Sequence, residues 1–340
     1  MKAVVYTETG GPDVLRLVDR EKPAVRAGQV RVRVVVSAVN PTDWRSRSGQ
    51  SSGMKFTEQV PHQDGAGVVD AVGDGVSGFV PGQRVWLWDV AFGRPSGTAQ
   101  EFVSVPARHV RPLPDTASFD VGACLGIPAL TAHRTLTTAA DGPRQIAPGT
   151  FTGRTVLVHG GAGAVGHAAI QLAVRAGATV LTTVSSAEKA DLASSAGAHH
   201  IINYRTEDVA SRVLSLVRRG VDHIVEVDLP ANLDTDVQVL AQNGNINVYT
   251  YGSGAPSAIP TPAMLMKNVQ LDFTYTYTTP AAHKDSALSD VDAAIKDGAL
   301  RVGTEHGLPL QRYPLGDTAQ AHAALERNIV GKVLIDLTDA

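Results

Sequence analysis

The chain has 340 residues, of which 43% are hydrophobic and 19% charged, and its formal net charge at pH 7 is −3. Because a single hydrophobic core rarely grows beyond about 250–300 residues, this length predicts two domains. The small net charge, with no run of lysine and arginine, argues against a surface for nucleic acid or for an anionic membrane.

Cysteine content and hydropathy narrow the class of protein further. Cys124 is the single cysteine, which excludes an internal disulfide and any multi-cysteine metal site. No stretch approaches the roughly 20 apolar residues of a membrane-spanning helix, and the N-terminus turns polar too early for a signal peptide. We therefore expect a cytoplasmic protein by default.

The first third of the chain predicts a compact, barrel-like group of strands. Valines alternate with Arg31 and Arg33 between Val30 and Val39, as expected for a half-buried strand. Turns containing glycine and proline separate this segment from its neighbours. The expected strands cover residues 3–6, 14–18, 30–39, 65–72, 84–88 and 100–105.

From about Ala123 the pattern changes to alternating strands and helices. A helix is expected over 130–140, followed by a surface loop over 141–153. Strand–helix units then repeat along the chain. This alternation is typical of an α/β fold, in which a parallel sheet carries helices on both faces. The expected units cover residues 155–176, 179–196, 200–217 and 222–240.

The first of these units contains a glycine-rich turn between its strand and its helix. Gly161, Gly163 and Gly166 have the G-x-G-x-x-G spacing of a dinucleotide-binding turn. Glycine is needed there because a side chain would keep the backbone away from a pyrophosphate, which the N-terminus of the helix attracts. The alternative is a purely structural turn. The expected coenzyme contacts in this turn are Gly160, Gly161, Ala162, Gly163, Ala164, Val165 and Gly166.

The end of the second strand indicates which dinucleotide binds. An NAD site usually places an acidic residue about 20 residues after the glycines, to bind the ribose 2′-hydroxyl. Here the strand ends at Ser185 and Ser186, with Lys189 shortly after, and these groups suit a 2′-phosphate. Glu188 is the opposing charge, which a helical position could direct to solvent. The alternative is that these residues form only a helix cap and a solvated face. The pattern favours NADPH.

Distinctive segments occur along the whole chain, at residues 10–15, 39–41, 47–49, 66–69, 82–85, 126–132, 159–166, 197–198, 203–205 and 331–333. On these segments the chain resembles the zinc-independent branch of the medium-chain dehydrogenases/reductases, and more narrowly the NADPH:quinone oxidoreductases of the zeta-crystallin type. Alanine is common in the family where Gly160 stands, which is a mild departure.

The resemblance implies a GroES-like β-barrel catalytic domain plus a Rossmann domain with a doubly wound parallel sheet. The first would cover residues 1–123, completed by 279–340, and the second residues 124–278, with the coenzyme in the cleft between them. Lys189 and Tyr204 fall on the family positions that hold the 2′-phosphate. The set of expected coenzyme contacts is completed by Tyr249, Gly252 and Ser253.

The residues at the family's zinc-ligand positions bear on the chemistry. Asn40, Gln63 and Ile127 stand there, so no metal is expected, and His62 is interpreted as a turn or core histidine rather than a ligand. Without a Lewis acid, oxidation of an ordinary alcohol is difficult. Quinones and conjugated enones accept a hydride directly. We therefore expect NADPH-dependent, two-electron reduction of such an acceptor, with an enone or enoyl-thioester reductase as the alternative.

Four residues are candidates for the reacting end. The amide of Asn40 could bond the nicotinamide, the ribose or the acceptor oxygen, or it could cap the turn at Pro41. Asp43 is either a cap at the start of a helix or a ribose contact. Arg45 replaces the tyrosine common in the family, and Thr131 lies beside the nicotinamide in relatives or simply belongs to its helix. A thioester substrate would need a basic groove, to which Arg45, Arg47 and Arg94 could contribute.

Aromatic residues and a late strand suggest two further surfaces. Trp86, Trp88 and Phe92 could rim a quinone pocket or belong to the core. Residues 269–278 alternate apolar and polar side chains, which predicts a strand at the edge of the nucleotide-domain sheet. In the family such strands pair across a two-fold axis, so we expect a homodimer. A structural or RNA-binding role, as for zeta-crystallin-like proteins, is the alternative from another class.

Overall fold

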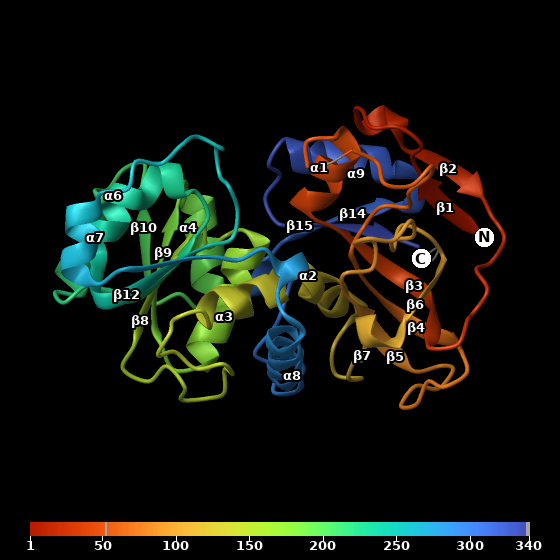
Figure 1. Ribbon diagram of the computed structural model, residues 1–340, viewed down its shortest axis with the longest axis horizontal. Coiled ribbons are helices and arrows are strands. Elements are labelled where there is room, and N and C mark those ends of the chain that lie inside the picture. The colour runs from red at the N-terminus through yellow and green to blue at the C-terminus, as the bar shows by residue number, and fades with distance from the viewer. Residues whose placement is uncertain (52, 338–340) are drawn as a thin grey trace. The chain divides into compact units, whose positions relative to one another are not determined.

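The computed structural model describes residues 1–51 and 53–337, which separate into two compact units (Figure 1). The first unit comprises Met1–Ile127 and Pro309–Ala340, and the second comprises Pro128–Leu308. The expected second boundary at residue 279 differs from this division. The intervening residues belong to the second unit because α8 (Ala281–Lys296) bonds there, through Asp290 to His133 Nε2 at 2.7 Å and to the N–H of Ile146 at 2.6 Å.

The first unit is built on a seven-stranded sheet in the order β14-β15-β3-β4-β5-β7, with β6 also paired to β3. A separate antiparallel pair joins β1 and β2, and helices α1 (Pro41–Ser48) and α9 (Thr318–Glu326) belong to the same unit. The strands are β1 (Lys2–Val5), β2 (Arg16–Asp19), β3 (Gln29–Val39), β4 (Asp64–Val72), β5 (Arg84–Leu87), β6 (Phe102–Pro106), β7 (Val110–Pro112), β14 (Leu310–Pro314) and β15 (Lys332–Asp336).

The long strand β3 organises this unit because it pairs with β4, β6 and β15. Val30, Val32, Val34 and Val36 are all at most 2% exposed, which confirms the expected alternation along the strand. Trp86 and Trp88 are also buried, so they belong to the core and form no exposed rim. Phe92 is partly buried.

The second unit contains a six-stranded parallel sheet in the order β10-β9-β8-β11-β12-β13. Helix α2 (Phe119–Leu136) begins in the first unit and continues into the second. The strands are β8 (Thr155–His159), β9 (Thr179–Val184), β10 (His200–Asn203), β11 (Val221–Glu226), β12 (Leu240–Val248) and β13 (Gln270–Phe273). The helices are α3 (Ala164–Arg175), α4 (Ala187–Ser195), α5 (Val209–Leu216), α6 (Leu229–Val239), α7 (Thr261–Lys267) and α8.

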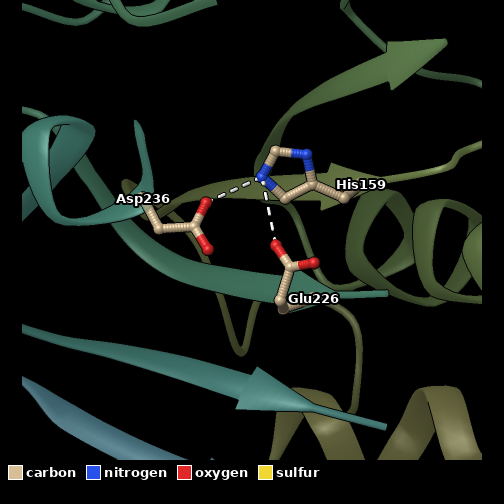
Figure 2. A group of neighbouring side chains, drawn as sticks. All are labelled: His159, Glu226 and Asp236. Carbon is tan, nitrogen blue, oxygen red and sulfur yellow. Dashed lines mark hydrogen bonds and ion pairs between the residues drawn. The ribbon is translucent and has the colours of Figure 1, made fainter. Parts of the chain in front are cut away.

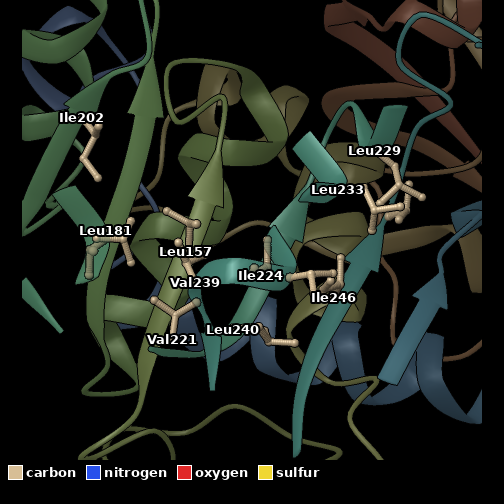
Figure 3. Close-up of a cluster of buried hydrophobic side chains, with 13 residues drawn as sticks. Leu157, Leu181, Ile202, Val221, Ile224, Leu229, Leu233, Val239, Leu240 and Ile246 are labelled. Atoms are coloured by element: carbon tan, nitrogen blue, oxygen red, sulfur yellow. The ribbon is translucent and has the colours of Figure 1, made fainter. Parts of the chain in front are cut away.

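Apolar side chains of the central strands form the core of the second unit (Figure 3). Leu157, Leu181, Ile202 and Ile224 come from four neighbouring strands and are fully buried. Strands buried on both faces are typical of a parallel sheet covered by helices. The α/β prediction for this part of the chain is therefore confirmed, and all four expected strand–helix units are present.

Several expected elements differ in extent, and three of these differences have an identifiable cause. The helix expected over 130–140 is the end of α2, which starts at Phe119 and accommodates Pro128. The strand expected over 14–18 starts at Arg16 because Pro12–Val14 forms a short 3₁₀ helix. The strand expected over 269–278 covers only Gln270–Phe273. It ends there because its neighbour β12 ends at Val248, which pairs with Phe273.

Among the described residues, no helix is both long enough and apolar enough to cross a bilayer.

Candidate functional site

The glycine-rich turn lies between β8 and α3, as predicted. Gly160 has a φ of +71°, a conformation that favours glycine. The N–H groups of Gly160 and Gly161 donate to the Thr183 carbonyl at 3.1 and 3.3 Å, and the Gly163 N–H donates to the Gly160 carbonyl at 2.9 Å. The turn is thus tied to the neighbouring strand β9 and to itself.

The three glycines of the motif are required for different reasons. A Cβ on Gly161 would lie 2.1 Å from Thr182 Oγ1, and one on Gly166 would lie 2.4 Å from the Gly160 carbonyl oxygen. Both positions are therefore fixed by packing within the protein. A Cβ on Gly163 would approach its nearest neighbour only to 3.3 Å. Gly163 is the N-cap of α3, so its lack of a side chain suits a ligand that must approach the backbone there.

The residues expected to bind a 2′-phosphate gather at the end of β9. Ser186 caps α4, with its Oγ 3.3 Å from the Lys189 N–H, so the capping role is real. The Lys189 ammonium also donates to Ser185 Oγ at 3.2 Å. Tyr204 follows β10 and donates its N–H to the Val184 carbonyl at 3.1 Å, which holds its half-exposed ring near the same strand end. Glu188 is exposed.

The remaining expected coenzyme contacts follow β12. Tyr249 donates its N–H to the Glu226 carbonyl at 3.2 Å. Gly252 has a φ of +52°, and the Ser253 N–H donates to Asp228 Oδ1 at 3.2 Å. This segment is therefore anchored to the end of β11.

A group that sequence reasoning missed lies in the same unit. His159, Glu226 and Asp236 are the one set of three potential metal ligands brought together among residues 1–51 and 53–337. Each stands in an otherwise apolar or helical stretch that periodicity assigns to the core. The available signal was a histidine and a glutamate that each end a buried strand.

The candidate residues of the first unit lie in a buried polar network. Asn40 donates from Nδ2 to Asp64 Oδ2 at 2.7 Å, and its Oδ1 accepts from the Lys332 ammonium at 2.5 Å. Lys332 also donates to the Val39 carbonyl at 3.0 Å, and the Ile127 N–H donates to Asp64 at 3.0 Å. The amide of Asn40 is thus engaged at both ends. Sequence reasoning missed Asp64 and Lys332 as members.

Burial is the largest influence on the pKa values of the two carboxyl groups in and beside this network. It raises the pKa of Asp64 to about 6, although the Lys332 cation and the Asn40 hydrogen bond favour the ionised form. Burial also raises the pKa of Asp43 to about 8. Asp43 accepts the Asn40 backbone N–H at 2.7 Å, so it caps the start of α1, as one of its two expected roles requires.

The other two candidates are placed separately. Arg45 lies on α1, with its guanidinium 5.4 Å from the centre of the Trp44 ring. Thr131 belongs to the second unit, where its hydroxyl bonds that of Thr276. The structure of each unit therefore brings Asn40, Asp43 and Arg45 onto one helix start and leaves Thr131 with the sheet unit.

His62 is a buried core histidine, in agreement with the interpretation from the sequence. It has a φ of +80°, its Nδ1 lies 2.8 Å from Ser37 Oγ, and its Nε2 lies 2.9 Å from Nε2 of His322. Gln63 accepts the Ala91 N–H at 2.9 Å. Two imidazoles in contact share a single proton between their facing nitrogens.

This histidine pair predicts a loss of stability in acid. Burial, with Arg47 nearby, lowers the pKa of His322 to about 3, against about 6.5 in an unfolded chain. Between these two pH values only the unfolded state binds the extra proton. The contribution of the pair to the free energy of unfolding is therefore complete above pH 6.5 and is lost as the pH falls toward 3. Replacing His322 with glutamine should therefore make the free energy of unfolding less dependent on pH by about 1.4 kcal/mol per unit. Chemical denaturation of both proteins from pH 7 to pH 4 measures the slopes, and equal slopes would contradict this assignment.

Two of the three arginines expected to form a basic groove make hydrogen bonds within the first unit. Arg47 is fully buried and bonds the Gly10 carbonyl and the Glu326 carboxylate. Arg94 donates to the Val90 carbonyl at 2.6 Å and contacts His109 Nε2 at 3.0 Å. Arg47 is therefore unavailable to a thioester substrate without breaking these contacts, whereas Arg94 is partly buried and hydrogen-bonded within the unit.

Comparison with known proteins agrees with this organisation. An alcohol dehydrogenase GroES-like domain model matches residues 26–115, and a zinc-binding dehydrogenase model matches residues 164–291. A quinone oxidoreductase of Lama guanicoe is 31% identical over 341 residues, which cover 98% of this chain and 97% of the relative. That of Rattus norvegicus is 36% identical over 248 residues, which cover 72% of each chain.

A solved structure shares the same fold. The quinone oxidoreductase of Escherichia coli complexed with NADPH is 26% identical, with a TM-score of 0.82 over 99% of this chain and 100% of that chain. The resemblance drawn from sequence motifs is thereby confirmed. With its glycine-rich turn, its parallel-sheet unit and its strand-rich unit, the chain belongs to the quinone oxidoreductase family of the medium-chain dehydrogenases/reductases.

Proposed function

We propose that this protein is an NADPH-dependent reductase that transfers hydride to a quinone or a similar conjugated carbonyl acceptor, without a metal. The observation that carries the proposal is the pairing of a glycine turn at the N-cap of α3 with the Ser185–Lys189 contact at the end of the next strand. A carboxylate at that strand end would repel a 2′-phosphate, whereas this pair attracts it. The relatives named quinone oxidoreductase support the acceptor class.

The residues with proposed roles belong to both units, and those proposed to bind the coenzyme all belong to the second. When bound, NADPH supplies a hydride from its nicotinamide ring. The turn at Gly160–Gly166 holds the pyrophosphate, and Lys189, Ser185 and Tyr204 hold the 2′-phosphate. Electron-poor acceptors need only placement and modest hydrogen-bond donors, because their developing oxyanion is delocalised.

The residues proposed for the reacting end are Asn40, Asp43, Arg45 and Thr131. The contacts of Asn40 with Asp64 and Lys332 fix the orientation of its amide, which leaves one Nδ2 hydrogen to donate. Asp43 holds the backbone at the same helix start. Arg45 offers a cation where relatives commonly have a tyrosine.

Initial rates of NADPH oxidation across a panel of acceptors test the proposed function. Quinones and simple enones are expected to be reduced, and primary alcohols are not expected to be oxidised with NADP⁺. Enoyl-CoA esters are expected to react poorly, because Arg47 and Arg94 are held by internal partners. Robust alcohol oxidation without quinone or enone turnover would contradict the proposal.

Replacing Lys189 with alanine should reduce the preference for NADPH over NADH. Loss of a hydrogen bond to a charged group costs about 1.5–3 kcal/mol, so the Kd of NADPH should rise at least about tenfold. The Kd of NADH should stay nearly constant. Calorimetric titration with both coenzymes measures this split, with the exposed Lys296→Ala as the control. Equal loss of both coenzymes would show that Lys189 does not bind the 2′-phosphate.

We also propose that the protein forms a homodimer through β13. Within the described residues β13 pairs only with β12, and apolar side chains are exposed on and near it, including Leu265 (75%), Met266 (77%) and Phe273 (70%). An edge of this kind favours pairing with a second copy.

Replacing Phe273 with aspartate is therefore expected to give a monomer, because it places a charge in the apolar interface. Light scattering at micromolar concentration measures the mass. Val80→Asp is the matched control, since Val80 is an apolar side chain of similar exposure (62%) in the first unit. A wild-type monomer would contradict the proposed assembly.

A further inference from the structure

Three buried ionisable side chains adjoin the glycine turn, and the function proposed above gives them no role. His159 ends β8, Glu226 ends β11 and Asp236 lies in α6, and their side chains are at most 4% exposed. Figure 2 shows both carboxyl groups directed at the same ring nitrogen. His159 Nε2 lies 2.8 Å from Asp236 Oδ1 and 3.5 Å from Glu226 Oε2. We refer to these three residues as the triad.

The other ring nitrogen connects the triad to the turn. His159 Nδ1 lies 2.9 Å from Thr183 Oγ1, and the carbonyl of the same threonine accepts the N–H groups of Gly160 and Gly161. His159 also directly precedes Gly160 in the chain. The His159 ring is therefore hydrogen-bonded to Thr183, the residue whose carbonyl accepts the two N–H groups of the turn.

Glu226 connects the triad to the second segment expected to contact the coenzyme. Its Oε1 accepts from the Asp228 N–H and, at 3.0 Å, from Asn232 Nδ2. Asp228 Oδ1 accepts the Ser253 N–H, and a Cβ on Gly252 would lie 2.1 Å from that same oxygen. One hydrogen-bonded network thus reaches both the 160–166 turn and the 252–253 segment.

The charges favour a cation at the centre of the network. Burial alone would lower the pKa of His159, but the charge and hydrogen bond of Asp236, together with Glu226, raise it to about 9. The ring is then an imidazolium at neutral pH and donates from both nitrogens. Within the described residues Glu226 Oε2 and Asp236 Oδ2 make no hydrogen bond. Burial, together with the charge of Asp236, raises the pKa of Glu226 to about 7, although the ring favours its ionised form. The ring is therefore the one cation beside two buried carboxyl groups.

We propose that His159 is a positioning residue for the coenzyme, and that the triad holds the 160–166 turn and the 252–253 segment in their binding conformation before NADPH arrives. The inference rests on the proposed coenzyme function. A preformed site loses less conformational freedom on binding, so loss of the triad should weaken coenzyme affinity. It should leave turnover at saturating coenzyme unchanged, because the triad touches no reacting atom.

Calorimetric titration of NADPH against Asp236→Asn, His159→Gln and the double variant tests the proposal, with kcat measured at saturating coenzyme. Each single change should raise Kd about tenfold or more and leave kcat within about twofold. The double variant should bind NADPH no more weakly than whichever single variant has the higher Kd, because the two residues act as a unit. His223→Gln is the control: this buried histidine of β11 bonds the Thr135 carbonyl at 2.6 Å, away from the turn, and its loss should leave Kd within about twofold.

Several outcomes would overturn the proposal. They are an unchanged Kd in Asp236→Asn, a loss equal to that of His223→Gln, or additive losses in the double variant. Stoichiometric Zn²⁺ retained by the wild type and released by Asp236→Asn would identify a metal site instead. Wild-type protein that binds no NADPH would remove the proposed function as well, whereas normal binding by wild type and variants removes this inference alone.

If the variants do not fold, the pH dependence of NADPH binding by the wild type tests the proposal. The groups facing His159 are Asp236 from α6 and Glu226 from β11, with Tyr249 beyond Glu226. The Kd of NADPH should rise as the pH passes about 9 while the protein stays folded, because the ring loses its proton. A flat profile there would overturn the proposal.

Discussion

Replacing Gly166 with alanine is expected to abolish most coenzyme affinity. The new Cβ would lie 2.4 Å from the Gly160 carbonyl oxygen and 3.0 Å from Gly161 Cα, so the backbone of the turn must move away from α3. Forced repacking costs about 1–3 kcal/mol, which corresponds to a five- to 150-fold rise in the Kd of NADPH if the turn carries it. Thermal unfolding should show a lower Tm as well, because the clash is present without coenzyme.

Gly163→Ala separates packing from ligand contact. Its Cβ would lie 3.3 Å from the Gly160 carbonyl oxygen, a tight contact but not the 2.4 Å clash of Gly166→Ala. Tm should therefore fall less than in Gly166→Ala, while the Kd of NADPH rises. Gly53→Ala, where a Cβ meets nothing within 4 Å, is the control that should alter neither quantity. Unchanged NADPH binding in both turn variants would show that this turn is structural only.

Replacing Lys332 with methionine is expected to destabilise the first unit strongly. Lys332 is 2% exposed and its ammonium bonds Asn40 Oδ1 and the Val39 carbonyl, while Asp64 lies fully buried on the other side of Asn40. Removing one member of a buried charged group costs about 3–5 kcal/mol, because the remaining charge is left uncompensated. Chemical denaturation measures the free energy of unfolding.

Adding Asp64→Asn to Lys332→Met tests whether an uncompensated carboxylate causes the loss of stability. Removing the second charge should recover part of the loss, because no uncompensated carboxylate then remains buried. A double variant no more stable than Lys332→Met alone would show that methionine fails for lack of hydrogen bonds to Asn40 and Val39. A single variant as stable as the wild type would contradict the buried network itself.

The local structure of the proposed coenzyme site could be predicted from the sequence. The turn at Gly161–Gly166, its strand and its helix follow one another between Thr155 and Arg175, so spacing alone indicates their arrangement. The same holds for Ser185, Ser186 and Lys189, which share one strand end. Long-range partners could not be predicted in this way, because nothing local marks them.

The buried polar networks illustrate that limit. Lys332 meets Asn40 across 292 residues of chain, and His159 meets Asp236 across 77. In a one-dimensional pattern each looks like a polar interruption in a strand or helix. The division of the chain near residue 309 also depends on long-range contacts, since α8 is held in the second unit by bonds to residues 133 and 146. Trp86 and Trp88 show the reverse case, where tertiary burial decides between core and rim.

A single-turnover measurement tests the central claim most directly. The protein is mixed with one equivalent of NADPH carrying deuterium or hydrogen at the transferred position, followed by an excess of a quinone, and the nicotinamide absorbance is recorded. We predict oxidation of one equivalent of NADPH with formation of one equivalent of hydroquinone, slowed by the deuterium. No oxidation by any quinone or enone, in protein that oxidises an alcohol with NADP⁺, would contradict the account.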